Sequence, residues 1–490
     1  MSGLQVLPNE LILQTTLFIT SESTLAALAR TNRHLQQICN SRLYRHNVLY
    51  SNSSALEWAA QNGRMDTLQK ALDAGAPLPK KQAGGEFREE GPVTLRFGCE
   101  HLRVFQEFRP HPISLAAQAG HLHIVRYMID RGVRPNTTNP EWFTLLALAA
   151  VHGHASLVEY LVDVGARQSI RSFVGGLRPV ELAAFQGHVD IVEVLLSAPK
   201  GEEDEPGKED MMKDALFAAV MAGQIPVVQL LFTHGVQVNY FGSFGHFQGT
   251  PLLLAATNGM GELVSLLLAY GADPNLIPCP RLTNVPLTAA VIQGHDHLIR
   301  ILIHGTTRLQ RTRALAFAIA QANRGMAEAL LHGGAPPDFD PSEIPRNPGY
   351  GHAEWVQPLH FAVQNDSPGL VELLLDSGGD VNVRCDEYPS GRLGKLYDRA
   401  LFWAVEDCNQ TMVDLLLERG ADLEITDMMG CPPLTYAVKG GHEAIVRSLL
   451  DHGANPHCAV EYTGEKLLLS VQIKRSIRDQ LQEAEERWRT

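Results

Sequence analysis

The sequence predicts an all-α protein folded as a solenoid of about eleven helix–turn–helix units with β-hairpin-like fingers. Three recurring features predict this fold. An alanine recurs as an anchor in every unit, and six of the ten intervals between successive anchors are 33 to 36 residues long. An aliphatic residue lies three positions before every anchor, and a glycine lies sixteen positions after nine of the eleven anchors. The anchors are Ala59, Ala116, Ala149, Ala183, Ala219, Ala255, Ala290, Ala318, Ala362, Ala404 and Ala437.

Each unit is predicted to contain a short helix, a tight turn, a longer helix and a projecting finger. Apolar residues after the anchor recur at the spacing of one helical face, as at Ile191 and Leu195. The glycine sixteen residues after the anchor can adopt the left-handed conformation that ends the second helix. One such helix pair cannot bury its apolar face alone, so neighbouring units must stack. Trp58 and Trp403 occupy a position that is apolar in all units, which predicts that both lie in the core.

The connections between units vary in length. Only 28 residues separate Ala290 from Ala318, which leaves little room for a finger, so we expect a short turn near residues 306–310 instead. Four other connections are enlarged, and they span residues 77–111, 197–212, 336–357 and 383–399.

The repeated block resembles ankyrin repeats over residues 53–457. Its clear copies include Pro251-Leu252-Leu253-Leu254-Ala255-Ala256-Thr257-Asn258-Gly259 and Pro433-Leu434-Thr435-Tyr436-Ala437-Val438. The family motif Thr-Pro-Leu-His is best kept at Pro358-Leu359-His360, and other units hold Ser114, Thr288, Phe402 or Thr435 at the histidine position. In the family this histidine joins neighbouring units through backbone hydrogen bonds. The resemblance therefore implies a protein-binding solenoid whose joints are less regular where that histidine is lost.

Residues 1–50 differ from the repeats and are predicted to form three short helices. The residues Leu7-Pro8-Asn9-Glu10-Leu11, then Leu25 with Leu28, then Asn32-Arg33 and Leu43-Tyr44-Arg45 resemble an F-box, of the kind found beside ankyrin repeats in filamentous fungi. The resemblance implies docking onto the Skp-family adaptor of cullin–RING ligases. The tryptophan of many F-boxes is absent, and the alternative is a three-helix cap over the first repeat. The adaptor-binding candidates are Leu7, Pro8, Leu11, Ile12, Leu25 and Leu28.

Residues 463–490 are predicted to form a C-terminal capping helix. Charged residues fill one side, and one apolar stripe contains Leu469, Ile473, Ile477, Leu481, Ala484 and Trp488. Such a helix can close the exposed end of a solenoid, and the alternative is a separate partner-binding helix.

Composition excludes several classes of function. The net charge is −13, which argues against binding to nucleic acid or to an anionic membrane, because both need clustered Lys and Arg. The seven cysteines are never closer than 23 residues, which suggests neither a zinc ribbon nor a disulfide framework. The N-terminus lacks a basic leader, and no run of 18 apolar residues occurs. We expect a soluble intracellular protein, in the cytoplasm, the nucleus or both.

The sequence predicts no enzyme, because it contains no phosphate-binding loop, His-Glu-x-x-His motif or nucleophile elbow. We expect no catalytic residue, metal ligand or cofactor. Five histidines follow the turn glycines of five different units and so cannot converge on one ion, namely His121, His154, His188, His295 and His442. The acidic residues between Glu202 and Asp210 are interpreted as a solvated loop, or as a region that attracts a basic partner.

In a stack of this type the fingers and first helices line a concave face. The two residues after each small pair are predicted to face it, and their mixture of polar and apolar types is typical of a recognition surface. Aromatic residues on the connections and on the finger at 239–249 suit binding hot spots, although they can also fold back as local cores. The target-binding candidates are Gln186, Asn258, Gln293, Asn365, Tyr240, Phe244 and Trp355.

Two functions fit these features. The first is the substrate-recognition subunit of a cullin–RING (SCF-type) ubiquitin ligase, which docks the Skp-family adaptor and holds an unknown target protein close to the conjugating enzyme. The second is a non-degradative scaffold whose N-terminal helices only cap the stack.

Overall fold

The computed structural model describes residues 24, 27, 30, 33–50, 53–78, 111–139, 143–172, 176–198, 207–244, 247–276, 285–340, 356–385, 399–427, 430–457 and 475–489. The chain divides into two compact units. Unit 1 comprises residues 1–237 with 244–246, and unit 2 comprises residues 238–243 with 247–490.

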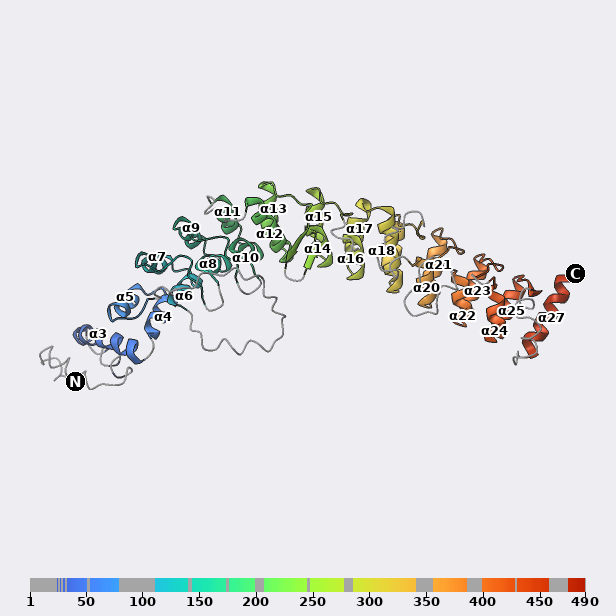
Figure 1. Ribbon diagram of the computed structural model, residues 1–490, viewed down its shortest axis with the longest axis horizontal. Helices are drawn as coiled ribbons and strands as arrows, with labels where there is room; N and C mark the ends of the chain where they lie inside the picture. Colours follow the sequence, from blue (N-terminus) through green and yellow to red (C-terminus); the bar gives the residue numbers. More distant parts are fainter. Residues whose placement is uncertain are drawn as a thin grey trace. The chain divides into compact units, whose positions relative to one another are not determined.

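In the described part of unit 1, helix α3 (Arg33–Tyr50) is followed by five helix pairs. Successive first helices contact one another from α4 to α12, and successive second helices do so from α7 to α13, so the pairs stack in two layers (Figure 1). Pairs 1 to 5 are α4 (Ser54–Gln61) with α5 (Met65–Asp73), α6 (Pro112–Gln118) with α7 (Leu122–Asp130), α8 (Leu145–Val151) with α9 (Ala155–Asp163), α10 (Pro179–Gln186) with α11 (Val189–Ser197), and α12 (Lys208–Met221) with α13 (Ile225–Thr233).

The boundary between the units falls at a hairpin of β1 (Gly242–Phe244) and β2 (Phe247–Gly249), which forms a finger as predicted. Within unit 2, successive first helices contact one another and successive second helices do so as well, which gives two layers (Figure 1). The described helices of unit 2 form six pairs, numbered 6 to 11. Pairs 6 to 8 are α14 (Pro251–Thr257) with α15 (Gly261–Ala269), α16 (Pro286–Ile292) with the segments η3 (Asp296–Leu298), α17 (Ile299–Leu302) and η4 (Ile303–Gly305), and α18 (Arg308–Ala320) with α19 (Arg324–His332). Pairs 9 to 11 are α20 (Pro358–Gln364) with α21 (Pro368–Asp376), α22 (Ala400–Glu406) with α23 (Gln410–Glu418), and α24 (Pro433–Gly440) with α25 (Glu443–Asp451), and a last helix, α27 (Arg475–Arg489), follows them.

The first helices begin where local chemistry favours a helix start. Several have proline in their first turn, where the missing N–H would have no partner in the helix. In α8 and α14 a threonine caps the helix, because Thr144 Oγ1 accepts from Ala147 N–H and Thr250 Oγ1 accepts from Leu253 N–H, both at 3.1 Å.

The turns inside and after each pair need left-handed backbone. All nine glycines that lie sixteen residues after an anchor have positive φ, between 79° and 95°. The turns between the two helices of a pair also use this conformation, and three of them hold a non-glycine residue there: Ala322, Asp366 and Cys408 have φ of 54°, 49° and 56°. The prediction that these glycines end the second helices is confirmed.

The core follows the predicted pattern closely. All eleven anchor alanines are 0% exposed, and the aliphatic residues three positions before them are at most 2% exposed. Paired helices can approach closely at the anchors because alanine adds only one methyl group, so the small residue is explained by packing.

The exposure of Trp58 contradicts the prediction that this residue lies in the core. Trp403 is 2% exposed because its ring packs edge to face against His360 of the preceding first helix, at 5.0 Å between ring centroids. Trp58 lies in the first pair, and among the described residues no first helix precedes α4. Its side chain is 53% exposed, so the prediction was wrong for Trp58 and right for Trp403.

Two connections are shorter than predicted. Residues 208–212 belong to helix α12, where Glu209 and Asp210 stand in the first turn and Met211 and Met212 are buried. Acidic residues are favoured there because the helix N-terminus carries partial positive charge. The expected turn near 306–310 is confined to Thr306 and Thr307, since α18 begins at Arg308.

The helices at the two ends each contact a neighbouring pair. α3 contacts α4 and α5, and Asn47 holds it there, with Nδ2 donating to Ser54 Oγ at 2.9 Å and Oδ1 accepting from Ala55 N–H at 3.0 Å. α27 contacts α25, and in it Ile477 and Leu481 are buried. Trp488 is 52% exposed, so the predicted stripe is not buried along its whole length; Leu469 and Ile473 lie outside the described residues.

Candidate protein-interaction surface

The ends of the first helices form a surface of mixed polar and apolar side chains at the same place in each pair. We call the residues two and three positions after each anchor the first-helix surface. Four predicted target-binding residues occupy the same place on it, at the C-terminal end of α10, α14, α16 and α20, and all four are exposed: Gln186, Asn258, Gln293 and Asn365. Asn258 and Gln293 lie on contacting first helices of unit 2, whereas Gln186 belongs to unit 1.

Asn365 has a structural role that the sequence pattern did not reveal. Its Nδ2 donates to the carbonyl oxygens of Ile319 and Ala320, at 2.9 and 3.0 Å. These carbonyls end helix α18, so the amide joins pairs 8 and 9. Because Nδ2 of Asn365 already donates to these carbonyls, a target would contact the other atoms of this side chain.

The other predicted site residues are only partly described. Tyr240 is half-buried next to the β1–β2 hairpin, and the neighbouring Phe241 is 47% exposed. Phe244 lies in β1, but its side chain is outside the described residues. Also outside them are Trp355 and the six adaptor-binding candidates Leu7, Pro8, Leu11, Ile12, Leu25 and Leu28.

A side chain in the turn of one pair fixes the first-helix surface of the preceding pair. His154 Nε2 lies 2.8 Å from Gln118 O, and Gln224 Nε2 donates to Phe185 O at 3.1 Å. The same contact occurs at 3.0 to 3.1 Å from His121 to Gln61 O, His188 to Val151 O and His295 to Thr257 O. In pairs 8 and 9 a residue at the end of the first helix makes it instead, from Gln321 to Ile292 O at 3.1 Å and from Asn365 to Ala320 O at 3.0 Å. Four of the five histidines that follow turn glycines thus bond the preceding pair in this way, whereas His442 places Nδ1 2.9 Å from Cys408 Sγ.

The expectation of irregular joints where the motif histidine is lost is wrong for two of the joints. Ser114 and Thr288 replace the motif histidine and are buried, yet the joints that lead into pairs 2 and 7 keep the contact, through His121 and His295. The joint that leads into pair 11 does differ, because Thr435 replaces the motif histidine there and His442 places Nδ1 2.9 Å from Cys408 Sγ.

A second set of repeated hydrogen bonds, which we call the finger ladder, joins neighbouring fingers. The side chain twenty residues after an anchor accepts from the backbone N–H of the next finger at 2.8 to 2.9 Å, as from Asn136 to Arg167, Asn239 to Asp273, Asn275 to Thr307, Asp338 to Asp380, Asn382 to Asp422 and Glu424 to Asn455. Asn239, Asn275 and Asn382 also donate from Nδ2 to a glycine carbonyl of that finger.

Besides Glu424, this ladder contains a second acidic side chain, that of Asp338. Burial raises the pKa of its carboxyl to about 6, the hydrogen bond from Asp380 N–H opposes that shift, and the charge of Asp380 adds to it. An ionised carboxylate cannot donate to the next finger as the asparagines do.

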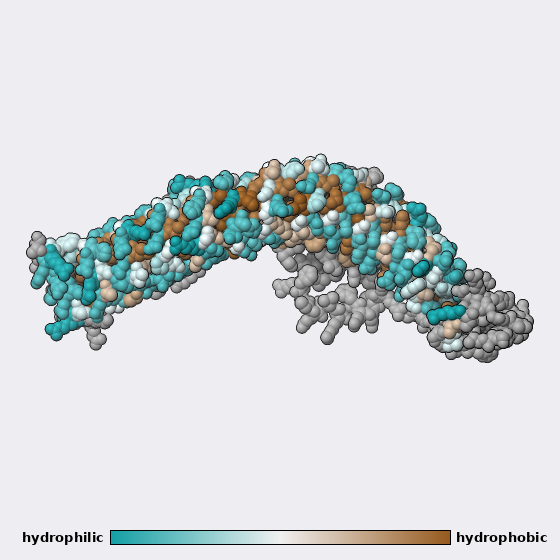
Figure 2. All heavy atoms as spheres, turned by 180° about the vertical axis from the view of Figure 1, so that it is seen from behind, coloured by the Kyte–Doolittle hydropathy of each residue, from teal (hydrophilic) through white to brown (hydrophobic). Residues whose placement is uncertain are grey.

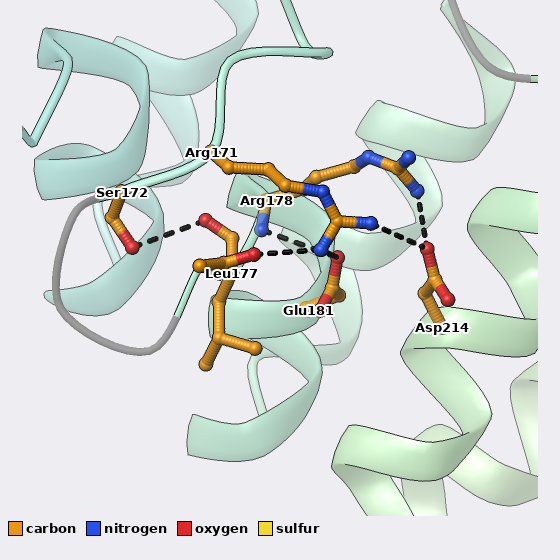
Figure 3. Close-up of polar contacts among 7 residues, drawn as sticks. Arg171, Ser172, Leu177, Arg178, Glu181 and Asp214 are labelled. Carbon is orange, nitrogen blue, oxygen red and sulfur yellow. Dashed lines mark hydrogen bonds and ion pairs between the residues drawn. The ribbon is translucent and has the colours of Figure 1, made fainter. Parts of the chain in front are cut away.

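A charged cluster lies between α10 and α12 in unit 1 (Figure 3). The guanidinium of Arg171 reaches both carboxylates, 3.7 Å from Glu181 Oε1 and 3.7 Å from Asp214 Oδ2. Arg178 pairs with Asp214 through its guanidinium and donates its backbone N–H to Glu181 Oε1 at 3.2 Å. Burial, with repulsion from Asp214, raises the pKa of Glu181 to about 7, against the opposing effect of the two arginines. Burial also raises the pKa of Asp214.

Hydrophobic side chains show as a band between hydrophilic ones on the face seen in Figure 2. The large hydrophobic side chains that are exposed among the described residues are Leu49, Trp58, Phe185, Phe241, Tyr270 and Trp488. Of these, Phe185 belongs to the first-helix surface, beside Gln186. Aromatic residues flanked by polar ones are typical of protein interfaces.

The described part of the chain lacks two kinds of feature. No group of three or more His, Cys, Asp and Glu side chains there could hold a metal ion. No helix there is long and apolar enough to cross a membrane.

Comparison with known proteins identifies the repeat. A family model described as ankyrin repeats, three copies, matches residues 113–205, 181–278 and 359–459, which together span more than half of the chain. The chain is 29% identical over 360 residues to ankyrin repeat and KH domain-containing protein mask-1 of Caenorhabditis elegans, covering 71% of this chain and 12% of that protein. It is 36% identical over 116 residues to the B-cell lymphoma 3 protein homolog of Mus musculus, covering 23% of this chain and 24% of that protein.

Among solved structures, the ankyrin repeat domain of Bcl-3 covers 48% of this chain and 98% of its own, at 26% identity and a TM-score of 0.39. The matches to the nematode and mouse proteins span a quarter or less of those relatives' length.

Proposed function

The chain belongs to the ankyrin-repeat family, and from that premise we propose that it is the substrate-recognition subunit of a cullin–RING (SCF-type) ubiquitin ligase. Ankyrin repeats imply protein–protein interaction. In this proposal the N-terminal segment docks the Skp-family adaptor, and the repeats hold a target protein. The contribution of the chain is proximity, which raises the effective concentration of target lysines near the conjugating enzyme.

The first-helix surface carries the target-binding half of the proposal. Its exposed side chains, including Phe185, Gln186 and Gln293, stand on helix ends whose carbonyls are fixed by the next pair. A surface fixed in this way loses little conformational entropy when a partner binds.

Site-specific crosslinking tests this surface. A photo-crosslinking residue placed at Gln186 or Gln293 should capture the same target in native cells. The control positions are Gln229 and Arg300, which are exposed on the second helices. Equal capture from the second helices would contradict the assignment of the surface.

The sequence between residues 7 and 45 carries the adaptor-binding half. The full chain should co-purify the Skp-family adaptor, and the double substitution Leu7→Asp with Leu11→Asp should abolish recovery, because charges replace the apolar contact residues. Leu49→Asp is the matched control, since Leu49 is 72% exposed in α3 and lies outside the candidate set. If the wild-type chain recovers no adaptor, or the double variant recovers as much, the ligase proposal is wrong.

The second candidate function is a non-degradative scaffold, and the contact of α3 with the first helix pair favours it. Asn47 attaches α3 to the start of α4, as a capping segment would be attached. Deletion of residues 1–48 separates the two candidates. A scaffold should lose thermal stability while the abundance of its target stays unchanged, whereas a ligase subunit should let its target accumulate.

A further inference from the structure

Cys408 occupies a turn position that glycine holds in most pairs. It lies four residues after its anchor, and its φ of 56° is unfavourable for a residue with a Cβ. Of the three cysteines whose side chains the structure describes, Cys408 is exposed, whereas Cys385 and Cys431 are buried. Neither burial nor backbone geometry explains a cysteine at this turn, and a strained position that packing does not explain points to a function.

The next helix pair places an imidazole against this thiol. His442 Nδ1 lies 2.9 Å from Cys408 Sγ, within hydrogen-bonding distance. At the joints with glycine the histidine ring fills the space of the missing side chain, because a Cβ on Gly120 or Gly259 would lie 2.5 or 2.7 Å from that ring. The side chain of Cys408 excludes this ring position. Nδ1 of His442 therefore meets the sulfur, and its Nε2 bonds no backbone carbonyl of the described residues.

The other two turns without glycine do not combine a nucleophile with a base. Asp366 accepts a hydrogen bond from Asn409 Nδ2, and Ala322 has no polar side chain. At the joint between pairs 10 and 11, by contrast, a thiol and an imidazole stand in direct contact. A cysteine with a base within hydrogen-bonding reach is the arrangement that activates sulfur for covalent chemistry, because the base can take the thiol proton.

The surroundings of the sulfur select the kind of reagent that can approach it. Cys408 follows Glu406 and Asp407, which are exposed on the first-helix surface of pair 10. Lys439 is exposed at the same place in pair 11. The two carboxylates repel an anionic reagent and leave the approach of an uncharged one unaffected.

We propose that Cys408 is a site of covalent thiol modification, which reacts with small uncharged disulfides and uses His442 as the base. The Cys408 sulfur attacks one sulfur of the disulfide while its proton passes to His442 Nδ1. A new S–S bond forms, the S–S bond of the reagent breaks, and the leaving sulfur takes the proton and departs as a thiol. The Cys408 sulfur is oxidised and the leaving sulfur is reduced. This chemistry does not depend on the proposed ligase function.

Disulfide exchange on the full chain tests the site. The probe is bis(2-hydroxyethyl) disulfide, which is uncharged, and peptide mass spectrometry follows the mixed disulfide at each cysteine. Cys408 should react before the buried Cys385 and Cys431. His442→Gln keeps a side chain that bridges a joint in pair 5, where Gln224 stands, but it removes the base. The rate at Cys408 should therefore fall by about 5-fold in this variant.

His295→Gln is the matched control, because it makes the same substitution at a joint that has glycine in the turn. It should leave the rate at Cys408 unchanged. A second probe, the dianion dithiodiglycolate, tests the role of the two carboxylates. Relative to a free cysteine peptide, it should react with Cys408 more slowly than the uncharged probe does, by about 2-fold or more.

Cys408→Gly tests whether the cysteine serves stability instead. Glycine relieves the left-handed φ and lets His442 take the ring position seen at Gly120, so the Tm should rise. A lower Tm would show that the cysteine is kept for packing, and would overturn the proposal. An unchanged rate at Cys408 in His442→Gln, an equal loss in His295→Gln, or no preference for the uncharged probe would overturn it as well.

Discussion

Thr288 and Thr306 are buried threonines that differ in one hydrogen bond. The Thr306 hydroxyl donates to Leu302 O at 2.7 Å, whereas the Thr288 hydroxyl has no hydrogen-bond partner in the structure. Thr288→Val should therefore raise the free energy of unfolding by ~1 kcal/mol, because valine removes a buried unpaired hydroxyl. Thr306→Val should lower it by ~1–2 kcal/mol. Chemical denaturation measures both, and a destabilised Thr288→Val would contradict the reasoning.

Ala322 occupies a turn position where eight of the other ten pairs have glycine. Its φ of 54° is unfavourable for a residue with a Cβ. Ala322→Gly should raise the free energy of unfolding by ~0.5–1 kcal/mol, although the added freedom of the unfolded chain offsets part of the gain.

Gly294 occupies the same turn position in pair 7, so Gly294→Ala is the reverse substitution. Gly294 has φ of 82°, and a Cβ there would meet no atom within 4 Å, so backbone strain alone should lower the free energy of unfolding by ~1 kcal/mol. Thermal denaturation of the two variants should give shifts of opposite sign, and shifts of equal sign would show that φ does not control this turn.

At the scale of helices and fingers, the turn histidines are the joints to test. His154 contacts Gln118 O, and its ring packs so close to Gly120 that a Cβ there would lie 2.5 Å from Nδ1. His154→Ala should lower the free energy of unfolding by ~1–1.5 kcal/mol. His154→Gln should cost less than ~0.5 kcal/mol, because Gln224 makes the same contact in pair 5. Equal losses in urea denaturation would exclude the hydrogen bond as the cause.

The hydrogen bonds of the finger ladder predict that Asp338→Asn raises the free energy of unfolding by an amount that depends on pH. Asparagine keeps the bond from Asp380 N–H, adds a donor and removes the buried charge. The raised pKa of about 6 means that wild-type stability falls as pH rises through 6, so the variant's advantage should be small at pH 4 and reach ~1–2 kcal/mol at pH 7.5.

Asn382→Asp is the matched control for the ladder. Asn382 accepts from Asp422 N–H at 2.9 Å and donates to Gly420 O at 3.3 Å. An ionised aspartate loses the donor, so this variant should be less stable than wild type at pH 7.5. Denaturant titrations at the two pH values test both changes, and the account fails if Asp338→Asn shows the same gain at pH 4 as at pH 7.5.

At the scale of the whole molecule, the main contacts between the described helices join neighbouring pairs within each unit, so the effects of a substitution should be local. Ile477→Asp puts a charge at a buried position where α27 contacts α25. Amide protection should fall in α25 and α23 and stay unchanged in unit 1. Trp488→Asp, at a position 52% exposed, is the control and should leave protection nearly as in the wild type. An equal loss in both units would mean that they unfold as one cooperative body.

The repeat itself could be predicted from the sequence because its determinants are local. The anchor alanines, the aliphatic residues three positions earlier and the glycines at helix ends act within one helix pair. Their burial and positive φ agree with the pattern in every described copy. The first-helix surface was predictable for the same reason, since helical geometry alone exposes Gln186 and Gln293.

Only the tertiary structure decided what each side chain meets across a joint. Trp403 is buried and Trp58 exposed although both occupy the same repeat position, because, within the part of the chain that the structure describes, a preceding first helix covers Trp403 and none precedes Trp58. Asn365 bonds carbonyls 45 and 46 residues earlier, and Glu181 meets Asp214 from the next pair. These contacts depend on how neighbouring pairs align, and periodicity within one pair carries no information about that alignment.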